Sequence, residues 1–279
     1  MSTPRGISVH IGVNVVDPVH YQGWSGPLSS CENDADTMQE IATGQGFETR
    51  QLKTTQATRE AVSQAIKDAA EELADGDFFL VTYSGHGGQI TDIDGDEEDG
   101  KDDTWCLYNG QFLDDEINVL FAEFKKGVRV LMLSDSCHSG TMLRGVVAAP
   151  ERTVSAEEEE YIHSRLMPRQ ASLKVSRKHR SFYADIQRNL PNPRPILNAT
   201  RRLLSGCQED QESFGSKLTG RFTAAVKKVF AQGAFDGNYA QFHQALVEEV
   251  SKAKNPQTPN HVVEGDTIEA FDKGPPFKI

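Results

Sequence analysis

The chain has 279 residues, of which 37% are hydrophobic and 25% charged, and this balance is typical of a folded protein with one large core. Its 41 acidic and 29 basic residues give a net charge of -12, so its averaged field repels nucleic-acid phosphates, and no nucleic-acid partner is expected. The longest apolar runs are far shorter than the ~20 residues of a membrane span, and the N-terminus lacks a secretory signal, so we expect a cytoplasmic protein without a membrane partner.

Three runs rich in apolar residues predict the strands of a central sheet. They occupy residues 7–13, 78–83 and 128–134. Because these runs are rich in apolar and β-branched residues, the strands are expected to be buried on both faces, as in parallel sheets. A further strand is predicted over residues 196–205.

Helices are predicted between and after these strands, from apolar residues at helical spacing. The first follows a capping box formed by Ser29 and Glu32, and Asp114 is expected to cap the third. The expected helices span residues 29–44, 58–76, 114–124, 221–230 and 238–252.

Strands that alternate with helices predict an α/β fold, with a mainly parallel central sheet and helices on both faces. In such folds the functional residues are expected at the carboxyl ends of the strands. Residues 146–189 depart from the pattern, because acids at 157–160 and bases between 165 and 180 occur without sustained apolar periodicity. We expect an exposed, weakly anchored linker there.

Two predicted strands end in loops that carry reactive side chains. The strand at 78–83 continues into a glycine-rich loop with His86, and the strand at 128–134 continues into a loop with Cys137. Neighbouring parallel strands lie ~4.8 Å apart, so a thiol and an imidazole just beyond their ends can face one crevice. This arrangement suits a cysteine nucleophile, and the flanking glycines leave backbone N–H groups free to face an oxyanion.

Alternatives to this interpretation come from the same residues. An isolated cysteine is more often a small buried core residue, but Cys137 is followed by His-Ser-Gly, which does not continue a core strand. A glycine-rich phosphate loop is disfavoured because neither G-x-G-x-x-G nor G-x-x-x-x-G-K-[ST] is present. The four cysteines form no C-x-x-C pair and are too few for a disulfide scaffold.

Five motifs in order along the chain resemble those of caspase-like cysteine peptidases, specifically metacaspases and their prokaryotic relatives, the orthocaspases. The two catalytic motifs are Tyr83-Ser84-Gly85-His86-Gly87 and Asp135-Ser136-Cys137-His138-Ser139-Gly140. The other three are residues 31–35, residues 204–208, and the ending from 257–259 to 264–266. The resemblance implies a caspase-like three-layer sandwich over residues 1–279, with a large-subunit-like portion 1–145, a linker 146–190 and a small-subunit-like portion 191–279.

The resemblance also implies roles for individual residues. Cys137 would be the nucleophile and His86 its proton-transfer partner, and the backbone N–H groups of Gly87 and Cys137 would form the oxyanion hole. The first specificity pocket (S1) would be lined by Cys31, Asp34, Ser84 and Asp135. Two carboxylates there would hold an Arg or Lys side chain at the substrate's P1 position. The alternative for Asp34 is a first-turn residue that stabilises a helix N-terminus.

A calcium site is the remaining implication. The acidic run 92–103 imitates an EF-hand loop, but Glu97 stands where the turn glycine is required, so an EF-hand is rejected. By the resemblance, an activating calcium would bind through Asp102, Asp114 and Asp115. A further family ligand after the nucleophile has no counterpart, because Arg144 stands near its place.

These inferences predict a monomeric, calcium-activated cysteine endopeptidase that cleaves protein or peptide substrates after Arg or Lys and has no organic cofactor. We also expect it to cut its own linker after Lys174, Arg177, Lys178 or Arg180, because exposed, weakly anchored backbone is where proteases act. The competing hypothesis is a non-catalytic interaction module that keeps the same fold.

Overall fold

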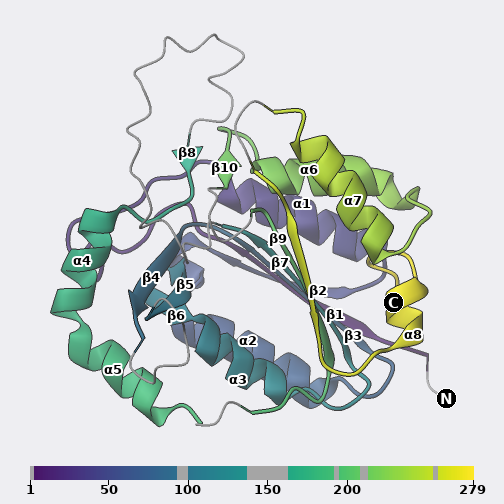
Figure 1. Ribbon diagram of the computed structural model, residues 1–279, viewed down its shortest axis with the longest axis horizontal. Helices are drawn as coiled ribbons and strands as arrows, with labels where there is room; N and C mark the ends of the chain where they lie inside the picture. Colours follow the sequence, from purple (N-terminus) through teal and green to yellow (C-terminus); the bar gives the residue numbers. More distant parts are fainter. Residues whose placement is uncertain (1–2, 93–99, 137–162, 192–194, 208–212, 254–256) are drawn as a thin grey trace.

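The protein folds around one six-stranded sheet in the computed structural model (Figure 1). The structure describes residues 3–92, 100–136, 163–191, 195–207, 213–253 and 257–279. The strand order is β11-β9-β7-β3-β1-β2, in which all neighbours are parallel except β11 and β9. These strands are β1 (Gly6–Gly12), β2 (Glu48–Lys53), β3 (Phe78–Ser84), β7 (Arg129–Asp135), β9 (Thr200–Ser205) and β11 (Asn260–Glu264).

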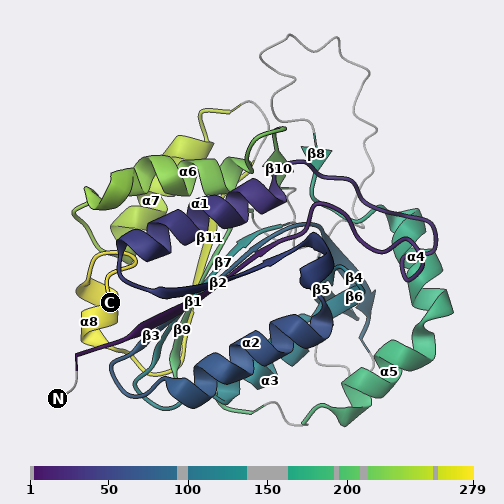
Figure 2. The ribbon, with the colours of Figure 1, turned by 180° about the vertical axis from the view of Figure 1, so that it is seen from behind.

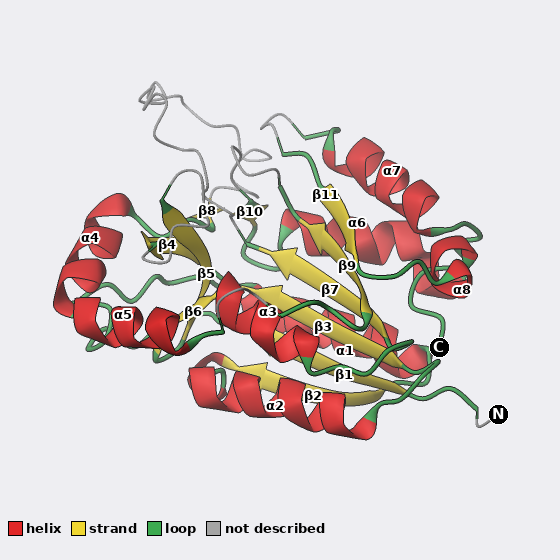
Figure 3. Cartoon of the chain, turned by 60° about the horizontal axis from the view of Figure 1, so that its bottom comes forward, coloured by secondary structure: helices red, strands yellow, loops and turns green. Residues whose placement is uncertain are grey.

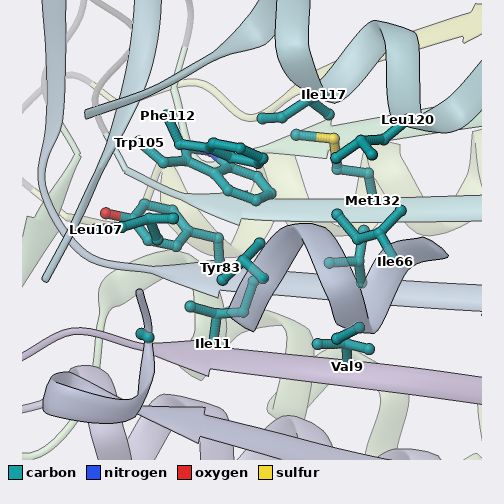
Figure 4. Packing of buried hydrophobic residues seen from close by; sticks show 14 of the residues in the cluster. Val9, Ile11, Ile66, Tyr83, Trp105, Leu107, Phe112, Ile117, Leu120 and Met132 are labelled. Carbon is teal, nitrogen blue, oxygen red and sulfur yellow. The ribbon is translucent and has the colours of Figure 1, made fainter. Parts of the chain in front are cut away.

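Helices cover both faces of this sheet, as the views from the front and from behind show (Figure 1, Figure 2). One face packs against helices α1, α6, α7 and α8 through Met38, Phe222, Phe242 and Phe271. The other face packs against α2 and α3, and Figure 4 shows Val9, Ile11 and Met132 of the sheet beside Ile66 and Ile117 of these helices. The bounds are α1 (Cys31–Gly44), α2 (Arg59–Glu72), α3 (Asp114–Ala122), α6 (Arg221–Phe230), α7 (Tyr239–Val250) and α8 (Glu269–Lys273), with short 3-10 turns at Thr54–Gln56 and Ala231–Gly233.

A small antiparallel sheet lies beside the carboxyl edge of the main sheet (Figure 3). It consists of β4 (Gly87–Thr91), β5 (Lys101–Leu107) and β6 (Gly110–Leu113), and it is followed along the chain by α3 and β7. Helices α4 (Arg169–Lys178) and α5 (Arg180–Asn189) lie next to this small sheet. A two-stranded ribbon joins β8 (His163–Ser164) to β10 (Phe214–Gly215).

The caspase-like layering predicted from the sequence is confirmed, and so are the strands at β1, β3 and β7 and the helix at α6. Thr58 caps α2 as expected, because its side chain accepts the N–H of Ala61. The capping box at the first helix is wrong. Helix α1 begins after Ser30 without a side-chain cap, and Asn14 Oδ1 instead accepts the N–H of Cys31 at 2.9 Å. Asp114 is the first residue of α3 rather than its cap.

The prediction of a weakly anchored linker is wrong for residues 163–190, although many of their side chains are exposed as expected. Val175 of α4 is fully buried, and Tyr183 of α5 is 3% exposed. Only a few apolar residues of these two short helices are buried, and Leu173 and Phe182 are exposed, so the buried pattern is too sparse to appear as a periodicity in the sequence. Residues 146–162 lie outside the described part of the chain. Within the described ranges, no helix combines the length and apolar character needed to cross a membrane.

Buried histidines make the fold sensitive to acid. His10 is fully buried between Thr82 Oγ1 and Ser8 Oγ, both 2.9 Å from its ring nitrogens, and burial lowers its pKa to about 3. Burial also lowers the pKa of His20 and that of His261 to about 4. Between pH 4 and 6.5 the unfolded chain therefore binds more protons than the folded one, so the free energy of unfolding must fall as the pH falls.

We predict that His10 alone lowers the free energy of unfolding by about 2 kcal/mol when the pH drops from 7 to 5. Urea unfolding at the two pH values measures this loss, and a His10→Asn variant should lose correspondingly less. Equal unfolding free energies for the native sequence at pH 7 and pH 5 would contradict the prediction.

Candidate active site

The carboxyl ends of β3 and β7 bring the predicted site residues together. The two strands are parallel neighbours, and their last paired residues are Ser84 and Asp135. His86 lies two residues after the end of β3. Cys137 follows Ser136, the last described residue after β7, and itself lies outside the described residues. Proximity of the thiol to His86 thus remains a prediction that rests on the strand register.

His86 is held in a fixed orientation. Its side chain is 6% exposed, its Nε2 lies 3.1 Å from the carbonyl oxygen of Gly26, and its ring packs edge-on against Trp24. Its own carbonyl accepts the N–H of Cys106. The loop before α1 and the small sheet therefore position an imidazole at the carboxyl edge of the main sheet.

An acidic pocket lies next to this histidine. Asp34 of α1 is 1% exposed and Asp135 of β7 is 3% exposed, and Ser84 donates to Asp34 Oδ2 at 2.7 Å. Cys31 is also fully buried here, and burial raises the pKa of its thiol to about 11. The four residues predicted to line S1 therefore come together, but Cys31 contributes as a neutral thiol.

The far wall of the pocket comes from the small-subunit-like portion, which sequence reasoning did not anticipate. The Thr219 hydroxyl and the Gly220 N–H donate to Asp34 Oδ1 at 2.8 and 2.9 Å. The Ser213 hydroxyl donates to Asp135 Oδ1 at 2.8 Å, and the N–H and hydroxyl of Thr223 donate to Oδ2 at 3.0 and 2.7 Å. No motif spacing marks these donors, because they belong to a short loop and to the first turn of α6.

The Arg165 guanidinium fills this pocket. Its Nη2 lies 2.7 Å from Asp34 Oδ2, and its Nη1 lies 3.2 Å from Asp135 Oδ1. Nη1 also donates to Ser84 Oγ at 2.7 Å and Nη2 to Ser30 Oγ at 3.1 Å. The side chain is fully buried. The sequence marked Arg165 only as one of several bases in the linker, so its position is the main finding that sequence reasoning missed.

The backbone around Arg165 is bound in an extended form. On its N-terminal side, β8 pairs antiparallel with β10, and the Arg165 N–H donates to the carbonyl of Ser213 at 3.0 Å. The Arg165 carbonyl accepts the N–H of Gly87 at 2.8 Å, and Gly87 is the residue predicted to contribute to the oxyanion hole. The Met167 N–H then donates to the Gly87 carbonyl at 2.8 Å. The segment therefore lies in an extended form across the strand ends, bound through its backbone on both sides of Arg165.

The charges in the pocket stabilise one another. Burial disfavours the charged form of Arg165, but the carboxylates of Asp135 and Asp34 more than offset this effect, so the pKa of Arg165 is raised. Burial raises the pKa of Asp135, and Arg165 acts in the opposite direction. Each charge depends on its partners, because an unpaired charge at this depth is strongly unfavourable.

The residues predicted to bind calcium lie on neighbouring elements of the small sheet. Asp102 is in β5, and Asp114 and Asp115 begin α3 directly after β6. Asp102 and Asp115 are 1% and 4% exposed, and Asp102 Oδ2 accepts the Gln187 side-chain amide at 2.7 Å. Across the described ranges, no three or more His, Cys, Asp or Glu side chains are grouped closely enough to hold a metal ion.

The fold and the site together define a caspase-like peptidase architecture. The caspase-domain family model matches residues 13–267, and since this is most of the chain, the protein belongs to that family. The resemblance predicted from the sequence motifs is thereby confirmed.

The curated relatives that the chain matches include metacaspases. Metacaspase-1A of Aspergillus clavatus is 26% identical over 246 residues, which cover 76% of this chain and 56% of that protein. Metacaspase-1 of Saccharomyces cerevisiae is 34% identical over 158 residues, which cover 50% of this chain and 35% of that protein. The chain thus spans only part of the length of these relatives.

The solved structures that are similar to this one include a bacterial protein and an insect caspase. A protein of Geobacter sulfurreducens is 40% identical and has a TM-score of 0.88, with 99% of each chain covered. Caspase-1 of Spodoptera frugiperda has a TM-score of 0.54 at 12% identity, with 93% of this chain and 88% of that chain covered. The second likeness shows a shared fold.

We predict that Arg165→Ala lowers the free energy of unfolding by about 3 to 5 kcal/mol, because it leaves two buried carboxylates without their countercharge. Urea unfolding in a Cys137→Ala background measures this, with the exposed Arg169→Ala as matched control. Millimolar agmatine should raise the melting temperature of Arg165→Ala but not that of the control. Equal stability of the two arginine variants would contradict the assignment of the pocket.

Proposed function

We propose that the protein is a cysteine endopeptidase that uses Cys137 and His86 to cleave peptide bonds after Arg, and less efficiently after Lys. The observation that carries the proposal is the position of Arg165. Its guanidinium lies between Asp34 and Asp135 while its carbonyl accepts the N–H of Gly87. A side chain and a backbone carbonyl of one residue thus occupy the places that a P1 residue would take.

Charge and shape explain the preferred P1 residue. The two terminal nitrogens of a guanidinium reach two carboxylates at once, which the single ammonium of Lys does less well. A P1 aspartate would add a third carboxylate to a buried pocket that already holds two, so it would be rejected. The loop residues of the small-subunit-like portion keep Asp34 and Asp135 in place.

The proposed mechanism is acyl transfer. A substrate strand would pair with β10 as β8 does, and its P1 carbonyl would take the place of the Arg165 carbonyl on the Gly87 N–H. The Cys137 thiolate would attack that carbon, and the N–H groups of Gly87 and Cys137 would stabilise the oxyanion. His86 would then protonate the leaving amine, and water would hydrolyse the thioester.

The same geometry supports self-processing at the Arg165–Leu166 bond. The four bonds expected from the sequence follow Lys174, Arg177, Lys178 and Arg180, which all lie in α4 or α5 or at their boundary. A helical bond cannot pair with β10 or reach the Gly87 N–H without unfolding first. Arg165 is already in the extended, bound form, so we propose it as the P1 residue of self-cleavage.

We also propose calcium as an activator at Asp102, Asp114 and Asp115. Hard carboxylate oxygens suit this ion, and the pairing of Thr104 with Leu113 places Asp102 and the start of α3 on adjacent chain segments. Calcium binding would require these carboxylates to converge and would compete with the Gln187 amide at Asp102. The rival interpretation is that Asp114 and Asp115 only stabilise the start of α3.

For the peptidase, we predict that wild type hydrolyses a fluorogenic peptide with Arg at P1, and that Cys137→Ala and His86→Ala abolish hydrolysis. Asp34→Asn should reduce it at least about 30-fold, because it removes one charge from a buried pair, whereas Asp36→Asn on the same helix should not. If the wild-type protein does not hydrolyse the peptide, the interaction-module hypothesis is favoured. Better cleavage after Asp than after Arg would refute the proposed specificity.

For self-processing, mass spectrometry of purified protein after incubation should find fragments ending at Arg165 and beginning at Leu166. Neither Cys137→Ala nor Arg165→Ala should produce them, whereas a variant with Arg177 and Lys178 both changed to Ala should. Cleavage confined to α4 or α5, or equal cleavage in Cys137→Ala, would rule out the Arg165–Leu166 bond as the self-processing site.

For the calcium site, we predict that millimolar calcium raises the melting temperature of the Cys137→Ala variant by at least about 3 °C. A ligand that binds only the folded state stabilises that state. Asp115→Asn should abolish this shift, and Asp185→Asn, at an exposed position on α5, should retain it. If calcium and chelator leave both activity and melting temperature unchanged, the helix-start interpretation is correct.

A further inference from the structure

The chain that follows the proposed scissile bond is fixed in place. The Met167 N–H donates to the Gly87 carbonyl, and the Met167 side chain is 3% exposed, with its sulfur 3.9 Å from Cys106 Sγ. Leu166 forms a parallel bridge with Gly87. The first two residues after the bond are therefore held by the same loop that binds the Arg165 carbonyl.

Helices α4 and α5 extend this attachment over the small sheet. The Ser172 hydroxyl donates to the carbonyl of Gln89 at 3.1 Å, and the Tyr183 hydroxyl accepts the N–H of Gln111 at 2.9 Å. The Gln187 amide donates to Asp102 and to the carbonyl of Thr91. Val175 is fully buried between these contacts. None of these interactions involves the Arg165–Leu166 bond, so cleavage leaves all of them intact.

This attachment changes the fate of the amine that self-cleavage releases. In ordinary proteolysis the leaving amine diffuses away and water attacks the thioester. Here the new α-amino group of Leu166 is tethered beside the position of the acyl carbon. Groups held in reactive geometry reach effective concentrations on the order of 10⁵ M or more, far above the roughly 55 M of water. The tethered amine therefore competes with water for the thioester.

We propose that the Leu166 amine of the cleaved protein is an acyl acceptor, so that the protein is also a peptide ligase that joins peptides ending in Arg to its own Leu166. This inference rests on the proposed function, because it uses the same thioester. In the ligation step the amine attacks the carbonyl carbon of the Cys137 thioester, and a C–N bond forms while the C–S bond breaks. The amine proton passes to His86 and the sulfur leaves as thiolate, with no other reactant. With Arg165 as the acyl group, the step reseals the chain.

Net self-cleavage should therefore be slow as long as the Leu166 end is held. Met167 is a positioning residue in this account, because it acts on the amine through the backbone rather than on the reacting carbon. Leu173 on α4 offers a matched control, since it is also apolar but 46% exposed. Loosening the attachment of the Leu166 end should increase the fraction of the thioester that water hydrolyses.

The experiment incubates self-cleaved protein with a peptide that has a fluorescent N-terminus and an Arg ethyl ester at its C-terminus. The expected product is fluorescent fragment 166–279, heavier by the peptidyl group, with tandem mass spectrometry locating that group on the Leu166 α-amine. Met167→Ala should lower the ratio of ligation to hydrolysis at least tenfold and speed net self-cleavage of fresh protein. Leu173→Ala should change neither.

The experiment separates a failure of the ligase inference from a failure of the proposed peptidase function. Hydrolysis of the ester without any labelled fragment overturns the ligase inference and leaves the proposed peptidase standing. Label on lysine side chains rather than on Leu166 overturns it as well, because no tethered amine is then involved. Absence of both hydrolysis and labelling overturns the proposed function and this inference with it. Slower self-cleavage in Met167→Ala would show that Met167 only stabilises the fold.

Discussion

The rest of the site depends on one buried ion triad, in which Arg165 lies between Asp34 and Asp135. Two carboxylates at this depth are tolerated only with a countercharge and with donors for their remaining lone pairs. The countercharge comes from the linker, and several of the donors come from the start of α6 and the loop before it. The triad therefore ties the large-subunit-like portion, the linker and the small-subunit-like portion to one point.

The triad also explains how one arrangement can serve both stability and catalysis. In the proposed function, the contacts that hold Arg165 in the pocket are those that a basic P1 residue of a substrate would make, and the hydrogen bond from Gly87 to its carbonyl is the one that catalysis would need. A substrate with a basic P1 residue would therefore have to displace the protein's own arginine. In the proposed function, the affinity of the pocket for arginine would set the strength of that competition, and the attachment of α4 and α5 would set what happens after self-cleavage.

Sequence reasoning predicted the parts of the site that sit at the ends of regular elements. Ser84 and Asp135 end buried strands, and Asp34 lies in the first turn of α1, so apolar patterns and motifs located all three. Arg165 gave no such signal, since its partner Asp34 is 131 residues away and its own segment has no periodicity. Helix α4 was missed because only Ala171 and Val175 are buried in it. The order of residues 163–190 comes from tertiary contacts that local sequence does not encode.

The most direct test of the account is a crystal structure of the Cys137→Ala variant, in which the chain cannot cut itself. The account predicts electron density for the Arg165 guanidinium between the carboxylates of Asp34 and Asp135, with the Arg165 carbonyl on the Gly87 N–H. An Arg165 side chain in solvent, with the two aspartates paired to another group, would contradict it.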